Sequence, residues 1–360
     1  MKRILKVVVF LVVLFLLSLG IELYIVKRRG RMVHELVNPD LYASDVFPEE
    51  QFHCRKERQI IHREYVLKGR ERMRKSRVVL CGLCRNIEEN MPRITRRMEK
   101  TGALFADYRI IVFENDSADG TRALLNEWQE KNPRVLNIET EVKDNKFGLR
   151  PLYEFGILSN DRIYRMAHFR NYYLDVVKNE YADFDYMIVL DMDVKGPWIM
   201  DGIADTIGHD HWDAVGAYGL MPFPGLLGIM YAMYDPLAYV SLDESYDQPM
   251  NQKELVAKFL SVNFIELAGV GRGDELVPVK SCFAGMCVYK IPSIMNARYE
   301  GGRCEHIEFH RLMSENGHGK IFMNPSMIIL CGWQGPNNLT QIHSNGGKKC
   351  TDLRYAAIVS

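Results

Sequence analysis

Two aspartates one residue apart, Asp191 and Asp193, come directly after the most apolar run of the chain. That run reads YMIVL (186–190), which is typical of a strand buried on both faces. Two carboxylates at a strand end can both reach a hard divalent cation, and Mg²⁺ or Mn²⁺ held in this way takes its remaining ligands from substrate phosphates and water. D-x-D alone is a weak signal, because any acidic turn after a strand produces it, so the neighbouring strand ends decide its weight.

Two earlier apolar runs also end in polar residues. The run 78–84 ends in Arg85-Asn86, and the run 108–113 leads into the loop ENDSADGT (114–121). Ligands of open α/β sheets bind outside the carboxyl ends of the strands, so we expect all three polar clusters to converge on one edge. This setting favours a functional metal site at the aspartate pair.

The elements that must position these clusters follow from the pattern after Arg77. Short apolar runs alternate with segments of helical periodicity, which predicts an α/β domain with a mainly parallel sheet. We expect helices at 91–100, 121–128 and 165–178, and a further strand at 134–140.

The N-terminal segment has a different composition. Val7 to Val26 form an apolar run of 20 residues, which as a helix spans about 30 Å, the thickness of a bilayer core. No small-x-small cleavage site precedes the basic cluster 27–29, which favours a retained anchor over a cleaved signal peptide. Basic residues flank the run on both sides, so the side of the membrane that holds the body stays open. In a eukaryotic cell this organisation predicts a single-pass, type II protein of the Golgi or endoplasmic reticulum.

The predicted organisation has four parts: a short flank (1–6), a transmembrane anchor (7–26), a charged, partly helical stem (27–76) and one catalytic domain (77–360).

Composition excludes one class of partner. Lys plus Arg and Asp plus Glu both number 46, so no basic field is available to neutralise a nucleic-acid backbone. Eight cysteines are too few for a disulfide scaffold in 360 residues, and Cys81/Cys84 is the only close C-x-x-C pair. We expect buried or singly bridged cysteines rather than a zinc site.

At this point the chain resembles the glycosyltransferases with the GT-A fold, a Rossmann-like α/β fold. ENDSADGT (114–121) is similar to the nucleotide-binding turn of that fold, and VLDMD (189–193) to its metal-binding D-x-D. The block CEHIEFHRL (304–312) with KIFMNP (320–325) is similar to the acceptor-side helix and the strand after it, where family 2 enzymes carry Glu-Asp. Together with Arg170-Asn171, these motifs resemble glycosyltransferase family 69, the capsule-type α-mannosyltransferases, over residues 77–325.

The resemblance implies a nucleotide-sugar donor (GDP- or UDP-sugar, with mannose as one candidate), a glycan acceptor, and Mn²⁺ or Mg²⁺ held by the aspartate pair. It implies nucleotide contacts and diphosphate contacts from six residues: Arg85, Asn115, Asp116, Asp119, Arg165 and Arg170. For the two helical arginines, an ordinary salt-bridged position is an equal alternative.

The chain departs from the family pattern where Glu-Asp becomes Glu305-His306. If the enzyme inverts configuration, one of these two is the expected base for the acceptor hydroxyl, and if it retains configuration no base is needed on that face. His306 and His310 also stand at i and i+4, where they line one side of a helix or bind zinc. His343 is a candidate third metal ligand, because several GT-A enzymes complete the D-x-D site with a C-terminal histidine.

Two further segments carry expectations. Phe283-Ala284-Gly285-Met286 resembles the acceptor-facing turn of the fold, with core packing as the alternative. The aromatic segment 223–247 predicts a long, partly ordered insertion on the acceptor side.

Two other functions fit part of the pattern. LDMDV (190–194) also matches the D-x-D-x-V nucleophile loop of haloacid-dehalogenase-type phosphatases, which expects that loop on the first strand. A catalytically inactive, membrane-tethered carbohydrate-binding protein is the third possibility. The donor sugar, the base of the nucleotide, the acceptor and the linkage are not readable from the sequence.

Overall fold

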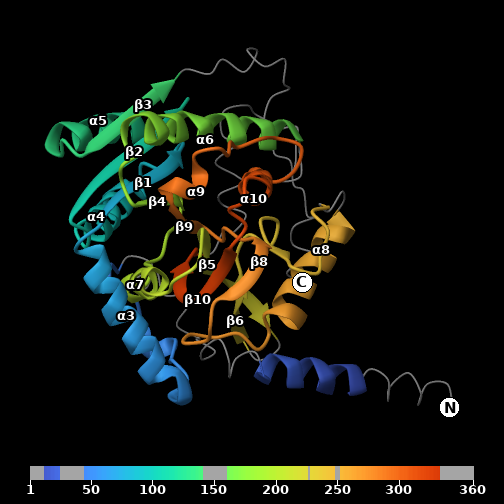
Figure 1. Ribbon diagram of the computed structural model, residues 1–360. Helices are drawn as coiled ribbons and strands as arrows, with labels where there is room; N and C mark the ends of the chain where they lie inside the picture. Colours follow the sequence, from blue (N-terminus) through green and yellow to red (C-terminus); the bar gives the residue numbers. More distant parts are fainter. Residues whose placement is uncertain (1–11, 25–43, 141–159, 226–227, 248–251, 333–360) are drawn as a thin grey trace.

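The computed structural model describes residues 12–24, 44–140, 160–225, 228–247 and 252–332 (Figure 1). Within these residues, ten strands form one sheet in the order β3-β2-β1-β4-β9-β5-β10-β8-β7, and β6 pairs with β5. The α/β class predicted from the sequence is confirmed.

One half of the sheet is parallel. Its order is β3-β2-β1-β4, and every neighbouring pair in it is parallel. β1, β2 and β4 are buried along most of their length, as their apolar sequences predict, whereas β3 at the edge of the sheet is only partly buried. Their bounds are β1 (Arg77–Cys84), β2 (Asp107–Asn115), β3 (Val135–Thr140) and β4 (Tyr186–Asp191).

The other half is mixed. β9 runs antiparallel to both β4 and β5, whereas β10 is parallel to β5. The half that is parallel throughout is therefore the one that carries the D-x-D pair, Asp191 and Asp193. The bounds here are β5 (Ala214–Gly225), β6 (Gly228–Met233), β7 (Val240–Ser241), β8 (Val277–Ser281), β9 (Met286–Lys290) and β10 (Ile321–Leu330).

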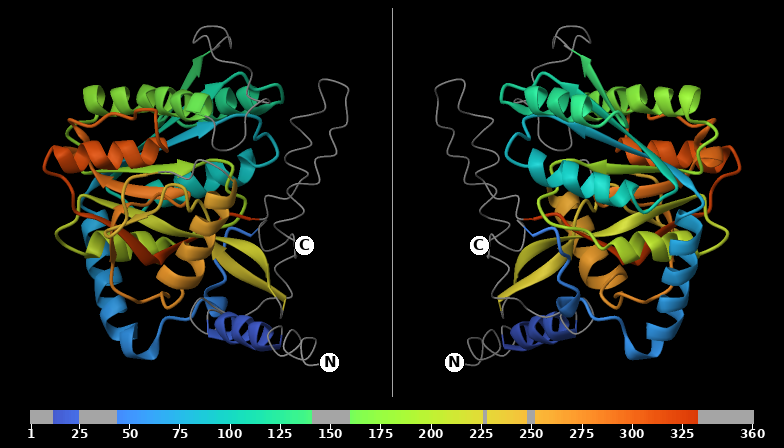
Figure 2. Two further views of the ribbon diagram at one scale, coloured as in Figure 1. Left: turned by 90° about the vertical axis from the view of Figure 1, so that its right-hand side faces the viewer. Right: turned by 90° about the vertical axis from the view of Figure 1, so that its left-hand side faces the viewer.

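Helices cover both faces of the sheet (Figure 2). Alternate residues of β1 separate the two cores: Val79 packs with α6 and α10, and Leu80 packs with α4, α5, α7 and α3. The helices are α3 (Gln59–Met73), α4 (Met91–Gly102), α5 (Thr121–Lys131), α6 (Asn160–Glu180), α7 (Met200–Gly208), α8 (Gln252–Ser261), α9 (Ile291–Ile294) and α10 (Glu305–Glu315). A π-helical turn, Val262–Glu266, follows α8, and two 3₁₀ turns, Glu49–Gln51 and Lys56–Arg58, precede α3.

The described part of the expected stem packs against the body. α3 crosses α7 so closely that a Cβ on Gly69 would lie 1.7 Å from the carbonyl oxygen of Ala204. Upstream, the carbonyl oxygen of Ser44 accepts a hydrogen bond of 2.8 Å from Arg97 of α4. The charged composition of this segment predicts a spacer, but its buried stripe (His62, Val66, Gly69 and Met73) docks it on the domain.

Residues 12–24 form a helix, drawn in dark blue in Figure 1. Among the residues that the structure describes, no helix is long and apolar enough to cross a membrane. The expected anchor 7–26 lies only partly within those residues.

The aromatic segment 223–247 differs from its prediction as an insertion. It contains the end of β5, all of β6 and β7, and Tyr231 and Met233 are buried in the core. β5 and β6 pair as an antiparallel hairpin, so apolar residues of this segment belong to the sheet. The aromatic composition of the segment does not indicate this pairing.

Candidate active site

The D-x-D pair stands at the carboxyl end of β4. Asp191 accepts long contacts of 3.5 Å at each oxygen, from Arg170 Nη2 at Oδ1 and from the hydroxyl of Tyr234 at Oδ2. Its backbone N–H donates to the carbonyl oxygen of Gly285 at 3.0 Å. Asp193, by contrast, is accessible to solvent although it stands among densely packed groups, so the pair offers one oriented carboxylate and one that a ligand can reach.

The backbone around Asp193 is held from another element. Asn90, buried at the start of α4, donates from Nδ2 to the carbonyl oxygens of Met192 (2.8 Å) and Val194 (3.0 Å). These two bonds bracket Asp193 and set the direction in which its side chain leaves the strand. Asn90 therefore acts as a positioning residue for the pair.

The surroundings of the pair are acidic and partly desolvated. Burial and the neighbouring charge of Asp193 raise the pKa of Asp191 above its usual value, although Arg170 opposes the shift. Desolvation also raises the pKa of Asp193, and burial with the charge of Asp191 raises that of Asp235. Carboxylates that resist ionisation together are stabilised by an added cation, so the pair fits a divalent metal.

Among the described residues, the D-x-D pair does not by itself complete the ligand set of such a metal. No three His, Cys, Asp or Glu side chains gather as a metal-binding group in the described ranges. This agrees with a site in which two carboxylates bind and substrate phosphates and water supply the rest. His343, the predicted third ligand, lies outside the described residues.

Arg170, a predicted diphosphate contact, is buried and makes several contacts within the protein. Only 3% of it is exposed, and its guanidinium donates to Glu305 Oε1 from Nε (3.0 Å) and to the hydroxyl of Tyr173 from Nη1 (3.2 Å), besides the contact with Asp191. The guanidinium thus lies in the protein interior, next to Asp191 of the D-x-D pair. Arg165, five residues earlier in the same helix, is buried as well.

The loops after β1 and β2 are joined by hydrogen bonds. The backbone N–H of Asn86 donates to Ser117 Oγ at 3.1 Å, and Asn86 Oδ1 accepts from the backbone of Ala118 at 2.7 Å. Thr121 Oγ1 accepts from the backbone of Ile87 at 2.8 Å. Residues 31 to 34 apart in sequence therefore form one rigid surface, the double loop (85–90 and 116–121).

Asp119 also takes part in the hydrogen bonds that join the two loops. Its oxygens accept from the backbone N–H groups of Glu88 and Thr121, each at 3.1 Å. Burial raises the pKa of Asp119, but the hydrogen bonds to its oxygens lower the pKa by more than burial raises it. The pKa of Asp119 is therefore below its usual value. The residue predicted to contact the nucleotide thus has a structural duty at the start of α5.

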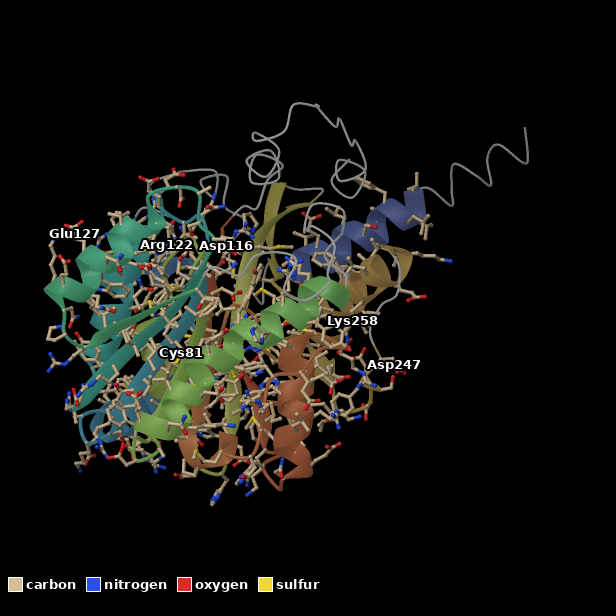
Figure 3. All side chains as sticks on the ribbon, turned by 90° about the horizontal axis from the view of Figure 1, so that it is seen from above. Cys81, Asp116, Arg122, Glu127, Asp247 and Lys258 are labelled. Atoms are coloured by element: carbon tan, nitrogen blue, oxygen red, sulfur yellow. The ribbon has the colours of Figure 1, made fainter. Side chains whose placement is uncertain are left out.

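Three other predicted nucleotide contacts lie at the same edge. Asp116, labelled in Figure 3, is half-buried with φ at 50°, a left-handed conformation that points to a tight constraint. Asn115 is buried and donates to Asp116 Oδ2 at 3.2 Å, while Arg85 is exposed at the end of β1. Glu114 is fully buried and binds Arg122 (2.8 Å), which anchors α5 to β2.

The Glu305-His306 pair is buried at the start of α10. Glu305 is 6% exposed and His306 2%. The His306 ring stacks on Phe283 (centroids 3.7 Å apart), and both of its ring nitrogens are buried without a hydrogen-bond partner. Burial lowers the pKa of His306 well below its usual value, so its imidazole is neutral.

His310 faces a different environment from His306. Its Nδ1 lies 2.8 Å from Ser281 Oγ and its Nε2 3.1 Å from the hydroxyl of Tyr289, and burial lowers its pKa to about 3. The two histidines share no metal-binding group within the described part of the chain. The i, i+4 spacing therefore serves core packing.

The turn 283–286 is tight and close to the pair. Ala284 and Gly285 both have positive φ, 51° and 87°. The turn also passes over β5, where a Cβ on Gly219 would lie 2.2 Å from the carbonyl oxygen of Ala284. Phe283 packs on His306 and lies under Arg170, so this turn supports the site from within the core.

Sequence reasoning missed Asn90, Tyr234 and Asp235. Tyr234 and Asp235 follow β6 directly, so a polar strand end is the signal in the sequence, but the aromatic composition of the segment favours an insertion over a strand. Asn90 gave no signal, because its partners lie about a hundred residues away. The sequence predicts buried or singly bridged cysteines, and the structure shows the first of these. All described cysteines are free, and all but Cys54 are buried.

No family model matches the chain, and no curated protein matches it. Among solved structures, it is similar to a mannosyltransferase from Pyrobaculum calidifontis in complex with GDP-Man and Mn²⁺ (11% identity, 83% of this chain and 77% of that chain, TM-score 0.41). It is also similar to glucosyl-3-phosphoglycerate synthase from Mycobacterium tuberculosis in complex with UDP (11%, 79% and 76%, 0.37) and to GalNAc-T7 with UDP, GalNAc and Mn²⁺ (12%, 72% and 44%, 0.40). At such TM-scores the function of this chain has to be inferred from its own site.

Proposed function

We propose that the chain is a metal-dependent glycosyltransferase of the GT-A type, which moves a sugar from a nucleotide-sugar donor to a hydroxyl of a glycan acceptor. One observation carries the proposal. Asp191 pairs in register with Leu83, and Cys84 with Glu114, so the D-x-D pair and the double loop stand side by side at one sheet edge. This is the edge at which open α/β sheets bind their ligands.

In this proposal Asp191 and Asp193 hold Mn²⁺ or Mg²⁺. When bound, the cation neutralises the negative charge that develops on the diphosphate leaving group. The raised pKa values of both carboxylates support a cation here, because desolvation disfavours their ionised forms and a bound cation would offset that penalty.

The nucleotide is proposed to lie on the double loop. Asn115 and Asp116 are the candidates for the base and ribose, and exposed Arg85 is the candidate for the phosphate side. Asp119 is assigned to holding the loop, because both of its oxygens are occupied by backbone N–H groups. A GDP- or UDP-sugar, with mannose as the candidate sugar, comes from the family 69 resemblance alone.

The phosphatase alternative is less well supported. It expects the D-x-D-x-V loop on the first strand of the domain, whereas β4 is the fourth strand in chain order. The phosphatase alternative also gives no role to the double loop.

We further propose that the N-terminal segment attaches the protein to a membrane. The helix 12–24 supports this, since Phe15, Leu16 and Leu17 are each more than half exposed (53%, 57% and 58%). Carbonate extraction of the full chain tests it. The protein should stay in the pellet, and Leu16→Arg with Leu17→Arg should release it; release of the unmodified chain would contradict attachment.

A thermal-shift and donor-hydrolysis screen tests the transferase proposal. The protein, from residue 44 onward so that α3 keeps its place on α7, is measured with UDP-, GDP- and CMP-sugars, with and without Mn²⁺. A ligand that binds only the native state raises the melting temperature by mass action. We expect a Mn²⁺-dependent shift and turnover with one nucleotide class, both lost in Asp191→Asn. A shift without turnover favours the inactive binding protein, and no shift with any nucleotide refutes the proposal.

A further inference from the structure

Arg170 contacts two carboxylates, Asp191 of the D-x-D pair and Glu305 of α10. Arg170 and Glu305 are both almost fully buried, and their contact, Nε to Oε1, is 3.0 Å. The contact between Arg170 Nη2 and Asp191 Oδ1 is longer, 3.5 Å. Arg170 is therefore held mainly by Glu305, and its contact with Asp191 is weaker.

The rest of the guanidinium is fixed by uncharged groups. Tyr173 accepts a hydrogen bond from Nη1 at 3.2 Å, and the Phe283 ring lies 5.2 Å from the guanidinium carbon. Neither group balances the positive charge. Glu305 is thus the carboxylate that, beside Asp191, neutralises Arg170, and it makes the shorter contact.

Glu305 is poorly placed to serve as a base. Only 6% of the residue is exposed; Oε1 accepts from Arg170, and Oε2 lies 3.9 Å from the sulfur of Cys304. A general base must come within hydrogen-bond reach of the proton that it takes. Both oxygens of Glu305 instead face the protein interior.

We propose that Glu305 is a positioning residue for the metal site: it holds and neutralises Arg170, so that Asp191 stays available to a divalent cation. The inference rests on the proposed function, because it assumes a metal at Asp191 and Asp193. Without the negative charge of Glu305, the full charge of Arg170 acts on Asp191 and competes with the metal. Partners of metal ligands typically change metal affinity 10- to 100-fold when they are altered.

Glu305→Gln isolates this effect. The glutamine oxygen still accepts from Arg170 Nε, so the shape of the contact remains while its charge is lost. We expect the Mn²⁺ dissociation constant to rise about 10- to 100-fold. We also expect kcat to return close to the wild-type value at saturating Mn²⁺, because no catalytic group has been removed.

Glu308→Gln is the matched control. Glu308 lies one turn further along α10, is equally buried, and also pairs with arginines, Arg303 and Arg311. None of these has a contact with Asp191, so its variant should bind Mn²⁺ like the wild type. Tyr173→Phe is a second probe that leaves no buried charge unpaired, and it should weaken Mn²⁺ binding by a few-fold.

The experiment is a Mn²⁺ titration of the full chain, followed by electron paramagnetic resonance of free Mn²⁺, with steady-state kinetics at rising Mn²⁺. Weaker binding in Glu305→Gln, with activity restored by excess Mn²⁺, supports the proposal. Unchanged Mn²⁺ binding in a folded Glu305→Gln, with a kcat that Mn²⁺ does not restore, overturns it and makes Glu305 the base. If Glu305→Gln does not fold, unchanged binding in Tyr173→Phe overturns it instead. Wild-type protein that binds Mn²⁺ no better than Asp191→Asn refutes the proposed metal site itself, which is a separate result.

Discussion

Asn90 and Met192 lie 102 residues apart in the sequence and are joined by a hydrogen bond of 2.8 Å, from Asn90 Nδ2 to the carbonyl oxygen of Met192. The same nitrogen also binds the carbonyl oxygen of Val194. One amide group from α4 therefore fixes the backbone on both sides of Asp193. The direction of a proposed metal ligand depends on a helix that the sequence gives no reason to connect with it.

Asn90→Ala should weaken the metal site and the fold together. It leaves two carbonyl oxygens without their donor, which should lower the free energy of unfolding by about 1–3 kcal/mol. Because the loop then moves more freely, Mn²⁺ affinity should fall about tenfold. Urea unfolding and Mn²⁺ titration measure the two effects. Asn90→Asp, which cannot donate as a carboxylate, should behave alike; wild-type Mn²⁺ affinity in both variants would refute the positioning role.

Mn²⁺ binding should depend on pH above the usual range of aspartate. Burial and mutual charge raise the pKa of Asp191, and desolvation raises that of Asp193, so protons compete with the metal at a higher pH than at an exposed Asp. Affinity should therefore fall as the pH is lowered from 8 to 5, by up to about tenfold per unit once a carboxylate is protonated. Titrations at several pH values measure this, and a constant dissociation constant over that range would contradict the raised pKa values.

The strand ends were predictable from the sequence because local patterns determine them. A buried strand is apolar along its length, so the residues at which polarity returns, such as Arg85, Glu114 and Asp191, mark its carboxyl end. The parallel order of β1, β2 and β4 then follows from the helices between them. These local signals were enough to place the D-x-D pair beside the double loop.

Side-chain roles were less predictable, because they depend on long-range contacts. Arg170 has the spacing of a helical residue near a ligand, but Glu305, 135 residues later, draws it into the interior. Asp119 matches a nucleotide-binding motif, but the backbone of Glu88 occupies one of its oxygens. The docking of residues 59–73 was hidden for a similar reason: charged side chains dominate the segment and suggest a solvated helix, but some of them, such as Arg70 and Arg72, bond to α7.

Gly69→Ala should destabilise the protein, because α3 and α7 cross at this point. The added Cβ would meet the carbonyl oxygen of Ala204 at 1.7 Å, and backbone cannot move aside as a flexible side chain can. Forcing the helices apart should cost about 1–3 kcal/mol of unfolding free energy. Arg63→Ala, on the exposed side of the same helix, is the control and should change it by less than about 0.5 kcal/mol. Equal stability of the two variants would show that α3 is not docked.

His306→Phe should stabilise the protein and keep it active. Both imidazole nitrogens are buried without a hydrogen-bond partner, which costs free energy, whereas a phenyl ring keeps the stacking on Phe283. We expect the free energy of unfolding at pH 7.5 to rise by about 1 kcal/mol, less than the full gain because the phenyl ring is slightly larger.

The pH dependence separates this effect from a general gain in packing. The folded-state pKa of His306 is lowered, so the unfolded chain binds a proton that the folded chain excludes, and stability is lost as the pH falls below about 6.5. The advantage of His306→Phe should therefore grow by about 2 kcal/mol between pH 7.5 and pH 5, measured by urea unfolding. Activity at pH 7.5 should stay within about twofold, because the imidazole is buried and neutral and accepts no proton from the acceptor. A loss of activity of a hundredfold or more with unchanged folding would instead assign His306 as the base.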